Sequence, residues 1–167
     1  MQSGALVADE VVNALVEKRL SEPDTACGFI LDGYPRTLEQ AKHLASWLEG
    51  RRIHEVVIHL AVDYNVIIAR LTGRRQCPRC GTLYNIVSRP PHVDGLCDLD
   101  GEKLVIRDDD RESVIRERLE AYERQTRPVL EYFLASGHRM EEVDASYASP
   151  DEVFEQICQM MVSHDRS

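Results

Sequence analysis

The amino-acid sequence predicts an α/β protein with a parallel sheet, into which a small cysteine-bearing subdomain is inserted. Short apolar runs typical of buried strands alternate with stretches whose apolar residues recur at helical spacing, and this alternation favours a parallel sheet. Residues 75–106 interrupt the alternation with cysteines, prolines and glycines, and they contain no long apolar run. The run at residues 28–32 leads into a tight turn that carries an acid and an arginine, and ligands of open α/β sheets bind at such strand ends.

The N-terminal part of the chain is expected to form a helix, a strand and a second helix. Apolar side chains at helical spacing predict the first helix over residues 8–20. A buried strand is expected over 28–32, because residues 29–31 are apolar without alternation, as in a parallel strand that is covered on both faces. Thr37 and Gln40 have the spacing of a capping box and predict the start of the second helix.

The alternation continues after this helix and resumes after the inserted subdomain. Strands are expected over residues 56–60 and 140–143. Asp63 is expected to cap the helix that follows the first of these strands. Ser149, followed by a proline and two acidic residues, predicts the start of the final helix.

The longest helix is expected to start at Asp110 and to run to about Ser136. Pro128 should bend it, because proline lacks the N–H group that a helix interior needs. Gly137 should end it, because glycine adopts the left-handed conformation of a helix C-terminus at little cost.

The composition is that of a single globular domain, since 167 residues with 43% hydrophobic content suffice to bury a core. The net charge of −9 argues against nucleic acid as a partner, because acidic residues repel its phosphates. No apolar run approaches the roughly 20 residues that span a bilayer, and no signal peptide follows Met1, so we expect no membrane partner and a cytoplasmic location. The five cysteines fit a reducing compartment, and Cys27 and Cys158 are expected to be ordinary buried thiols.

The cysteines of the inserted subdomain have the spacing of a structural zinc site. Cys77 and Cys80 form one Cys-x-x-Cys knuckle, and sixteen residues later Cys97 and Asp100 form a second. Zinc accepts a carboxylate oxygen in place of a sulfur, and a segment with almost no core of its own needs such a staple. The alternative is three surface thiols without a metal, which the spacing disfavours. Three other side chains could supply the fourth ligand in place of Asp100: Asp98, Asp94 and His92.

The turn after the expected strand brings an acid and a guanidinium group to one point. Asp32 ends the strand, Gly33 permits a sharp turn, and Pro35 stiffens it. Arg36 leaves the turn with a rigid fork of donors that suits a phosphate group. Further arginines lie around the inserted subdomain: Arg70, Arg74, Arg75, Arg107 and Arg118. Phosphoryl transfer depends on such neutralisation of phosphate charge, so a nucleotide is the expected ligand.

The sequence Asp-Gly-Tyr-Pro-Arg-Thr at residues 32–37, followed by Gln40, resembles the Asp-Gly-Phe-Pro-Arg-Thr signature of the adenylate kinases, with Tyr34 in place of the usual Phe. Leu-Thr-Gly-Arg-Arg at residues 71–75 is similar to the entrance of the lid in that family. The resemblance spans essentially all 167 residues. It implies phosphoryl transfer between adenine nucleotides, ATP + AMP = 2 ADP, with magnesium bound to ATP, in adenine nucleotide homeostasis.

The same resemblance implies how the chain is divided. Residues 1–74 and 108–167 would form a parallel-sheet core like that of the P-loop kinases, in which the segment at about 1–20 binds AMP. Residues 75–107 would form an inserted lid. Many bacterial adenylate kinases hold zinc in this lid through two Cys-x-x-Cys knuckles, or through a variant in which Asp ends the second knuckle. This variant corresponds to the following ligands: Cys77, Cys80, Cys97 and Asp100.

On the ATP side, the resemblance places Arg70 against the adenine and Arg74 on the phosphates. Arg107 and Arg118 match arginines that reach the phosphates when the lid closes, and they also belong to the AMP side. Asp109 matches a lid carboxylate that is paired within this cluster, while the segment with Tyr147 and Ala148 touches the ATP adenine through its backbone. Asp32 matches the acid that helps to hold the magnesium shell. The catalytic set implied is Asp32, Arg36, Arg74, Arg107 and Arg118.

On the AMP side, Leu6 and Val7 belong to a segment, residues 4–10, that resembles the lining of the AMP adenine site. Gly33 lies in the turn beside Arg36, which would grip the AMP phosphate. Gln40 would recognise the edge of the adenine. Its place in a capping box is a competing explanation for the same residue, and we favour base recognition.

The 167 residues contain no Gly-x-x-x-x-Gly-Lys-Thr loop, which in the family cradles the phosphates, and no counterpart of the family's first two strands. We therefore expect this chain by itself to be inactive and marginally stable, and to be a monomer with ATP, AMP and ADP as its ligands. The alternatives are another nucleoside monophosphate kinase, or a noncatalytic binding module stapled by zinc.

Overall fold

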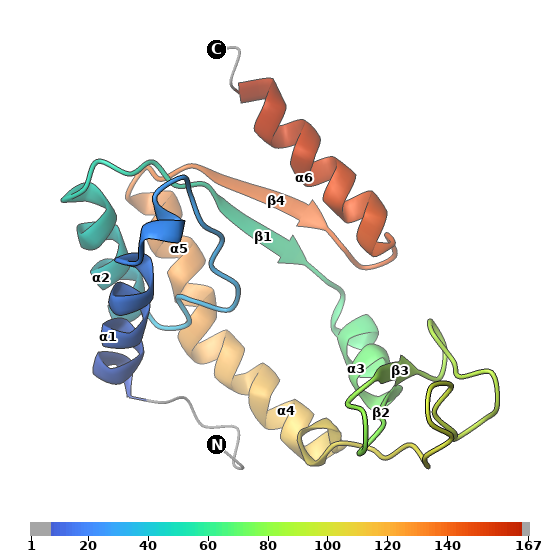
Figure 1. Cartoon of the computed structure of the whole chain (residues 1–167). Coiled ribbons are helices and arrows are strands. Elements are labelled where there is room, and N and C mark those ends of the chain that lie inside the picture. The colour runs from blue at the N-terminus through green and yellow to red at the C-terminus, as the bar shows by residue number, and fades with distance from the viewer. Residues whose placement is uncertain (1–7, 165–167) are drawn as a thin grey trace.

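The computed structural model of the protein describes residues 8–164. A two-stranded parallel sheet lies at its centre, formed by β1 (Val57–Ala61) and β4 (Met140–Asp144) (Figure 1). The register pairs Val57 with Met140 at one end and Ala61 with Asp144 at the other. The α/β class and the parallel pairing predicted from the sequence are confirmed.

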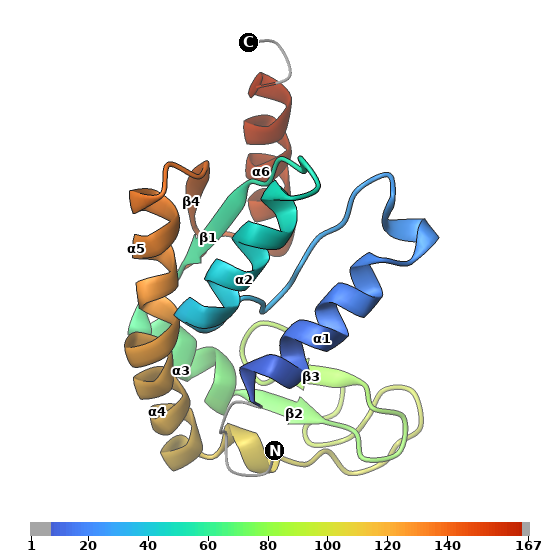
Figure 2. The ribbon, with the colours of Figure 1, turned by 90° about the vertical axis from the view of Figure 1, so that its left-hand side faces the viewer.

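Helices cover both faces of this sheet. α2 (Leu38–Glu49) and α5 (Arg127–Ala135) lie on one face, with α1 (Asp9–Leu20) beside α2, whereas α6 (Pro150–His164) lies on the opposite face (Figure 2). α3 (Tyr64–Thr72) follows β1 and leads into the cysteine-bearing segment, the name used below for residues 75–107. None of the helices within residues 8–164 is both long and apolar enough to cross a membrane.

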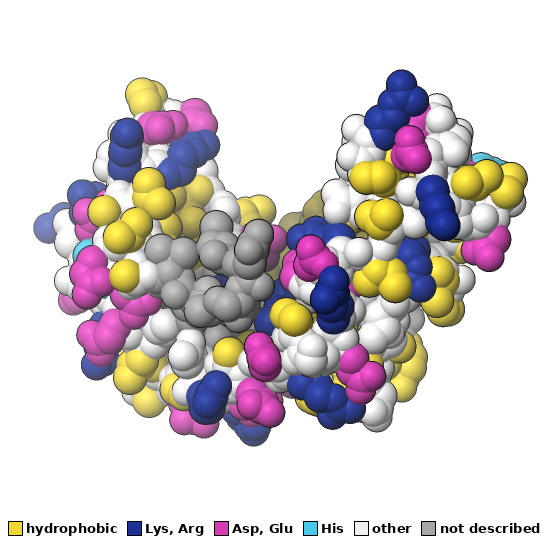
Figure 3. All heavy atoms as spheres, turned by 90° about the horizontal axis from the view of Figure 1, so that it is seen from below, with side chains coloured by type: hydrophobic (Ala, Val, Ile, Leu, Met, Phe, Trp, Pro, Cys, Tyr) yellow, Lys and Arg dark blue, Asp and Glu magenta, His cyan; other side chains and the backbone are white. Residues whose placement is uncertain are grey.

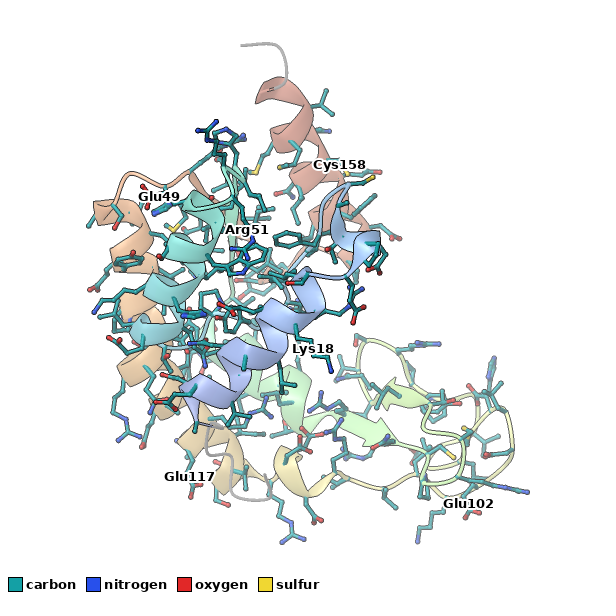
Figure 4. The ribbon with its side chains drawn as sticks, turned by 60° about the vertical axis from the view of Figure 1, so that its left-hand side comes forward. Lys18, Glu49, Arg51, Glu102, Glu117 and Cys158 are labelled. Atoms are coloured by element: carbon teal, nitrogen blue, oxygen red, sulfur yellow. The ribbon has the colours of Figure 1, made fainter. Side chains whose placement is uncertain are left out.

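Two apolar clusters join the helices to each other and to the sheet. The first links α1 to α2 through Leu20, Leu44, Trp47 and Leu48. The guanidinium group of Arg51 covers this cluster from outside, with its central carbon 4.0 Å from the centroid of the Trp47 ring (Figure 4). The second cluster links α2, α5 and β1 through Ala41, Val129 and Phe133, with Val57 packed against it.

Residues 28–31 do not form the strand that the sequence predicts. They make an irregular segment in which Phe29 and Leu31 pack against the cluster of α1 and α2, whereas Ile30 is 95% exposed. A strand requires a hydrogen-bonded neighbour, and within residues 8–164 no strand pairs with this segment. The apolar run therefore has only one covered face, although its sequence is that of a strand covered on both.

Side-chain caps hold three of the predicted helix starts, those of α2, α3 and α6. The Thr37 hydroxyl accepts a hydrogen bond from the Gln40 N–H at the start of α2, and Asp63 accepts from the Asn65 and Val66 N–H groups at the start of α3. α6 begins with a capping box in which the Glu152 N–H donates to the Ser149 hydroxyl, while the Ser149 N–H donates to the Glu152 carboxylate.

The long helix differs from its prediction at its start and near Pro128. α4 (Glu112–Ala121) begins two residues after Asp110, which lies instead in a 3-10 turn over Asp108–Asp110. A π-helical turn (Tyr122–Thr126) joins α4 to α5 and ends two residues before Pro128. The wider turn accommodates a residue that cannot donate a backbone hydrogen bond. The helix ends before Gly137, which has the expected positive φ of +76°.

Cys27 and Cys158 are exposed, contrary to the prediction that they are buried. Cys27 lies in the turn that follows the 3-10 helix Pro23–Thr25. Cys158 lies on α6, whose partly buried residues Val153 and Ile157 occupy another face of the helix (Figure 4). The sequence places Cys158 in an amphipathic helix but does not decide on which side of the apolar stripe it falls.

We expect Phe133→Ala to lower the free energy of unfolding by about 3–5 kcal/mol, the cost of removing a buried aromatic ring from a packed core. Phe133 is 2% exposed and joins α5 to α2 and β1, whereas its neighbour Leu134 is 58% exposed. Leu134→Ala is the matched control and should change stability by less than about 0.5 kcal/mol. Urea unfolding measures both variants, and equal losses would contradict the assignment of the core.

Candidate functional site

The cysteine-bearing segment is built around its own small core. β2 (Arg74–Gln76) pairs in antiparallel fashion with β3 (Leu83–Asn85), and Cys77 follows β2 directly. The buried side chains of the segment are Cys77, Tyr84, Cys97 and Leu104. Two of these four are cysteines, so apolar packing alone gives this segment little stability.

The four predicted metal ligands lie together. One sulfur or oxygen atom from each residue lies within 4.8 Å of the corresponding atoms of the other three: Cys77, Cys80, Cys97 and Asp100. The Cys80 and Cys97 sulfurs are 3.6 Å apart, and the Cys77 sulfur is 3.4 Å from a carboxylate oxygen of Asp100. Three thiols and a carboxylate that converge in this way have the chemistry and the number of donors of a tetrahedral zinc site.

The other candidates for the fourth ligand lie outside the cluster, and two of them, Asp98 and His92, contact each other. The Asp98 carboxylate accepts a hydrogen bond from the His92 N–H at 2.8 Å and lies 3.0 Å from the His92 ring nitrogen Nδ1. The Asp98 N–H donates to the Tyr84 hydroxyl, which also contacts the Cys97 sulfur at 3.5 Å. Asp94 is exposed and is not part of the cluster of four ligands. The geometry thus favours Asp100.

Burial and hydrogen bonding act differently on the members of this cluster. Burial raises the pKa of the Cys77 thiol to about 11. Hydrogen bonds with Thr82 lower the pKa of the Cys80 thiol, and hydrogen bonding to the Glu102 N–H lowers the pKa of Asp100. Because metals bind the thiolate, a cation at this position would reverse the effect of burial on Cys77.

Arg74 and Asp110 form a buried ion pair where the chain enters and leaves the cysteine-bearing segment. The Nε and Nη2 groups of Arg74 donate to the two oxygens of Asp110, and the Nε bond measures 2.7 Å. The Asp110 side chain has an exposed fraction of 0%, against 26% for that of Arg74. The hydrogen bonds that Arg74 donates to Asp110 raise the pKa of Arg74, as expected for a guanidinium group that contacts both carboxylate oxygens.

Arg107 and Arg118 meet on the neighbouring acid, Asp109. Arg107 donates to both oxygens of Asp109 at 2.8 and 2.9 Å, and a nitrogen of Arg118 lies 3.9 Å from one of them. Burial by itself raises the pKa of Asp109, but the hydrogen bonds and charge of Arg107, with the charge of Arg74, lower it overall. Two consecutive carboxylates therefore bring together Arg74, which precedes the cysteine-bearing segment, Arg107 at its end, and Arg118 of α4.

Arg70 is positioned by the segment that follows β4. Its Nη2 group donates to the carbonyl oxygens of Ala145 and Ser146, at 3.0 and 2.8 Å. The resemblance assigns both Arg70 and the segment with Tyr147 and Ala148 to the ATP adenine, and Arg70 contacts the two residues that directly precede this segment. Tyr147 is 86% exposed, so its ring remains available to a ligand.

The turn at residues 32–36 holds Arg36 against its own backbone. The Nε group of Arg36 donates to the Gly33 carbonyl at 2.6 Å, and a Cβ atom at position 33 would lie 2.6 Å from Arg36 Nη2. Gly33 has a φ of +72°, which an L side chain rarely adopts. Asp32 and Arg36 are both exposed, so their charged groups can reach a ligand in solvent.

The backbone of Arg36 is fixed from two sides. Its N–H donates to Gln40 Oε1 at 2.8 Å, and its carbonyl accepts from the Thr126 hydroxyl of the π-helical turn at 2.9 Å. Gln40 also donates from Nε2 to Asp9 at 2.8 Å. Gln40 thus takes part in the start of α2, as its spacing from Thr37 predicts, but its oxygen meets the N–H of Arg36 and not that of Thr37.

The surface is hollowed between the helical part with α1 and α2 and the part with β2 and β3, and Lys and Arg side chains lie at the floor of this hollow (Figure 3). Lys18 of α1 points toward the same gap, while Glu102 lies at the outer edge of the cysteine-bearing segment, away from α1 (Figure 4). Leu6 and Val7, which the resemblance assigns to AMP, lie outside the described residues.

Sequence reasoning missed two residues of this arrangement. From the sequence, Asp110 is expected at a helix start, and Asp9 only falls within the segment 4–10 that resembles the lining of the AMP adenine site. Their partners Arg74 and Gln40 are 36 and 31 positions away. No periodicity or local motif signals a pairing over such distances. The run of three acids at 108–110 beside arginines was the one available hint.

These features define an α/β protein whose arginines are suited to phosphate groups and whose thiols are suited to a metal. The sequence profile of adenylate kinase matches residues 1–138. An adenylate kinase of Thermoanaerobacter sp. strain X514 is 44% identical over 158 residues, which make up 94% of this chain and 72% of the relative. Adenylate kinases of Caldanaerobacter subterraneus subsp. tengcongensis (43% over 168 residues, 99% of this chain and 75% of the relative) and Thermotoga neapolitana (48% over 138 residues, 82% and 63%) are also similar. The chain belongs to the adenylate kinase family.

We expect Asp110→Asn to lower the free energy of unfolding by about 3 kcal/mol, because the variant leaves the guanidinium group of Arg74 without its buried counterion. Asp108→Asn is the matched control. Asp108 pairs with Arg111 at 93% side-chain exposure, so its loss should cost less than about 1 kcal/mol. Urea unfolding compares the two variants, and equal stability would show that the Arg74–Asp110 pair contributes nothing.

Proposed function

We propose that this protein is an adenylate kinase that catalyses the reversible reaction ATP + AMP = 2 ADP in adenine nucleotide homeostasis. Membership of the family supports phosphoryl transfer between adenine nucleotides. The observation that carries the proposal further is the gathering of Arg74, Arg107 and Arg118 on the adjacent acids Asp109 and Asp110. Such a group of cations can neutralise the charge of two nucleotides while a phosphoryl group passes between them.

On the ATP side, Arg70 is assigned to the adenine and Arg74 to the phosphates. The contact of Arg70 with the Ala145 and Ser146 carbonyls supports the first role, because it holds the guanidinium group at the residues that directly precede Tyr147. Arg107 and Arg118 are assigned to the phosphates of both nucleotides. Their shared partner Asp109 is about 42% exposed, so phosphate oxygens can replace it at little cost.

On the AMP side, Arg36 is assigned to the phosphate, with Gly33 and the residues Leu6 and Val7 lining the site. The exposure of Arg36 and its fixed backbone support this role, since a preorganised fork loses little entropy on binding a phosphate. Gln40 is assigned to the base. Asp32 is assigned to the magnesium ion that accompanies ATP, a role for which an exposed carboxylate beside a phosphate site is suited.

A structural zinc ion is assigned to the cysteine-bearing segment, which we propose to be the lid between the core regions 1–74 and 108–167. The cluster of Cys77, Cys80, Cys97 and Asp100 supports this assignment. When bound, zinc would cross-link the two knuckles of a segment that has little apolar core. A monomeric state and a cytoplasmic location belong to the same proposal.

We further propose that the 167 residues alone do not turn over ATP and AMP. Phosphate cradling needs consecutive backbone N–H groups at a helix start together with a lysine, and the sequence contains no Gly-x-x-x-x-Gly-Lys-Thr loop. A coupled assay of the chain alone, and of the chain joined to a segment of a relative that carries this loop, tests the function. Turnover by the joined protein only is the expected result, and no turnover by either protein would contradict the proposed reaction.

In the joined protein, Arg36→Ala should lower kcat/KM for AMP by the equivalent of about 2–4 kcal/mol while sparing kcat/KM for ATP, because one preorganised contact to the AMP phosphate is lost. Arg116→Ala removes the same charge from an exposed pair with Glu112 and should leave both values unchanged. Steady-state kinetics with each nucleotide varied in turn separates the two. Equal losses for AMP and ATP would show that Arg36 has only a structural role.

The purified chain should contain one zinc ion, which metal analysis by mass spectrometry measures. The double variant Cys77→Ser, Cys97→Ser should lose the metal, because two thiolate ligands are removed. Cys158→Ser is the control, since this exposed thiol lies outside the cluster and its loss should leave the zinc content unchanged. A zinc content near zero without chelators, or an unchanged content in the double variant, would contradict the assignment.

A further inference from the structure

The side-chain amide of Gln40 is held by two groups of opposite hydrogen-bonding character. Its Nε2 group donates to Asp9 Oδ1 at 2.8 Å, and its Oε1 atom accepts from the Arg36 N–H at 2.8 Å. A carboxylate can only accept and a backbone N–H can only donate, so the chemistry of both partners fixes which end of the amide is oxygen. Rotating the amide by 180° would place oxygen against oxygen and N–H against N–H.

Asp9 is itself held firmly. Its second oxygen, Oδ2, accepts from the Thr37 hydroxyl at 2.8 Å, and the same hydroxyl oxygen accepts from the Gln40 N–H at 3.2 Å. Asp9 is the first residue of α1, and a second contact between α1 and the turn joins Asn13 to the Tyr34 hydroxyl at 2.7 Å. Gln40 is 3% exposed, so solvent cannot compensate for a reversed amide.

The fixed amide has a defined set of hydrogen-bonding groups left for a ligand. A primary amide has two N–H donors and two lone pairs on its oxygen. With one donor given to Asp9 and one lone pair given to Arg36, Gln40 keeps one N–H and one lone pair. A 6-aminopurine presents a ring-nitrogen acceptor beside an amino donor, which matches this pair. A 6-oxopurine presents the reverse order, a ring N–H beside an oxygen, and would require the amide to rotate.

We propose that Asp9 is a positioning residue that locks the Gln40 amide and thereby selects a 6-aminopurine nucleotide over a 6-oxopurine nucleotide of the same shape. The inference rests on the proposed function, in which the base of AMP meets Gln40. Asp9 touches no ligand in this account, and it acts only by forbidding one of the two orientations of the amide.

Calorimetric titration of the 167-residue chain with AMP and with inosine monophosphate tests the lock through the ratio of the two dissociation constants. The unmodified chain should prefer AMP. Asp9→Asn should reduce this preference by about tenfold, within the range of discrimination that a bidentate contact provides, because an asparagine can offer either oxygen or N–H to Gln40. Glu39→Gln is the control: it removes the same charge from the neighbour of Gln40, at 71% side-chain exposure, and should keep the preference.

The ratio of the two dissociation constants distinguishes a positioning role of Asp9 from a purely structural one. A purely structural loss would weaken the binding of both nucleotides equally and leave the ratio unchanged. An unchanged ratio in Asp9→Asn, with AMP still bound by the unmodified chain, would overturn the lock and leave the proposed function intact. If the unmodified chain does not bind AMP, the same ratio is measured in the joined protein, and failure of both proteins to bind AMP would overturn the proposed function. If Asp9→Asn does not fold, Asp9→Ser provides the same comparison, because its hydroxyl is too short to hold Gln40.

Discussion

The arrangement of the arginines depends on their pairing with two consecutive acids of unequal burial. The side chain of Asp110 has no exposed surface and forms a bidentate pair with Arg74. The side chain of Asp109 is 42% exposed and pairs with both Arg107 and a more distant Arg118. Removing a buried partner costs several kcal/mol, but exchanging an exposed one costs little. The buried pair therefore acts as a permanent anchor for the chain entering the cysteine-bearing segment. The exposed acid Asp109 balances the charges of Arg107 and Arg118. In the proposed function, phosphate oxygens would replace it as their partner at little cost.

One helical rod connects this charge cluster with the turn at residues 32–36. Arg118 lies on α4, and Thr126 lies in the π-helical turn that follows, where its hydroxyl holds the carbonyl of Arg36. The wider turn before Pro128 places Thr126 at this position without requiring a donor from proline. The orientation of Arg36 and the position of Arg118 are thus set by one continuous element.

Local chemistry explains which parts of the structure the sequence could predict. The caps at Thr37, Asp63 and Ser149 depend on residues within three positions, and the zinc spacing depends on two short knuckles, so both were predicted and the four ligands lie together. The prediction of a strand at 28–32 was wrong, because a strand forms only where a neighbouring strand pairs with it, and apolar residues alone do not supply that neighbour. The long-range partners of Asp9 and Asp110 were not predictable either. Their carboxylates bind side chains more than thirty residues away, where no periodicity constrains the pairing.

The ion pair and the cysteine cluster hold the two ends of one short strand. Arg74 begins β2 and is tied to Asp110, and Cys77 follows β2 and belongs to the ligand cluster. Between these ties the segment has few buried apolar residues, and several large ones are exposed, such as Val87 at 79% and Leu99 at 75%. Hydrophobic burial therefore cannot fix the distance between the arginines and the tip of the segment. Electrostatic pairing can do so at one end, and bonds to the proposed zinc ion would do so at the other, because both are directional and short.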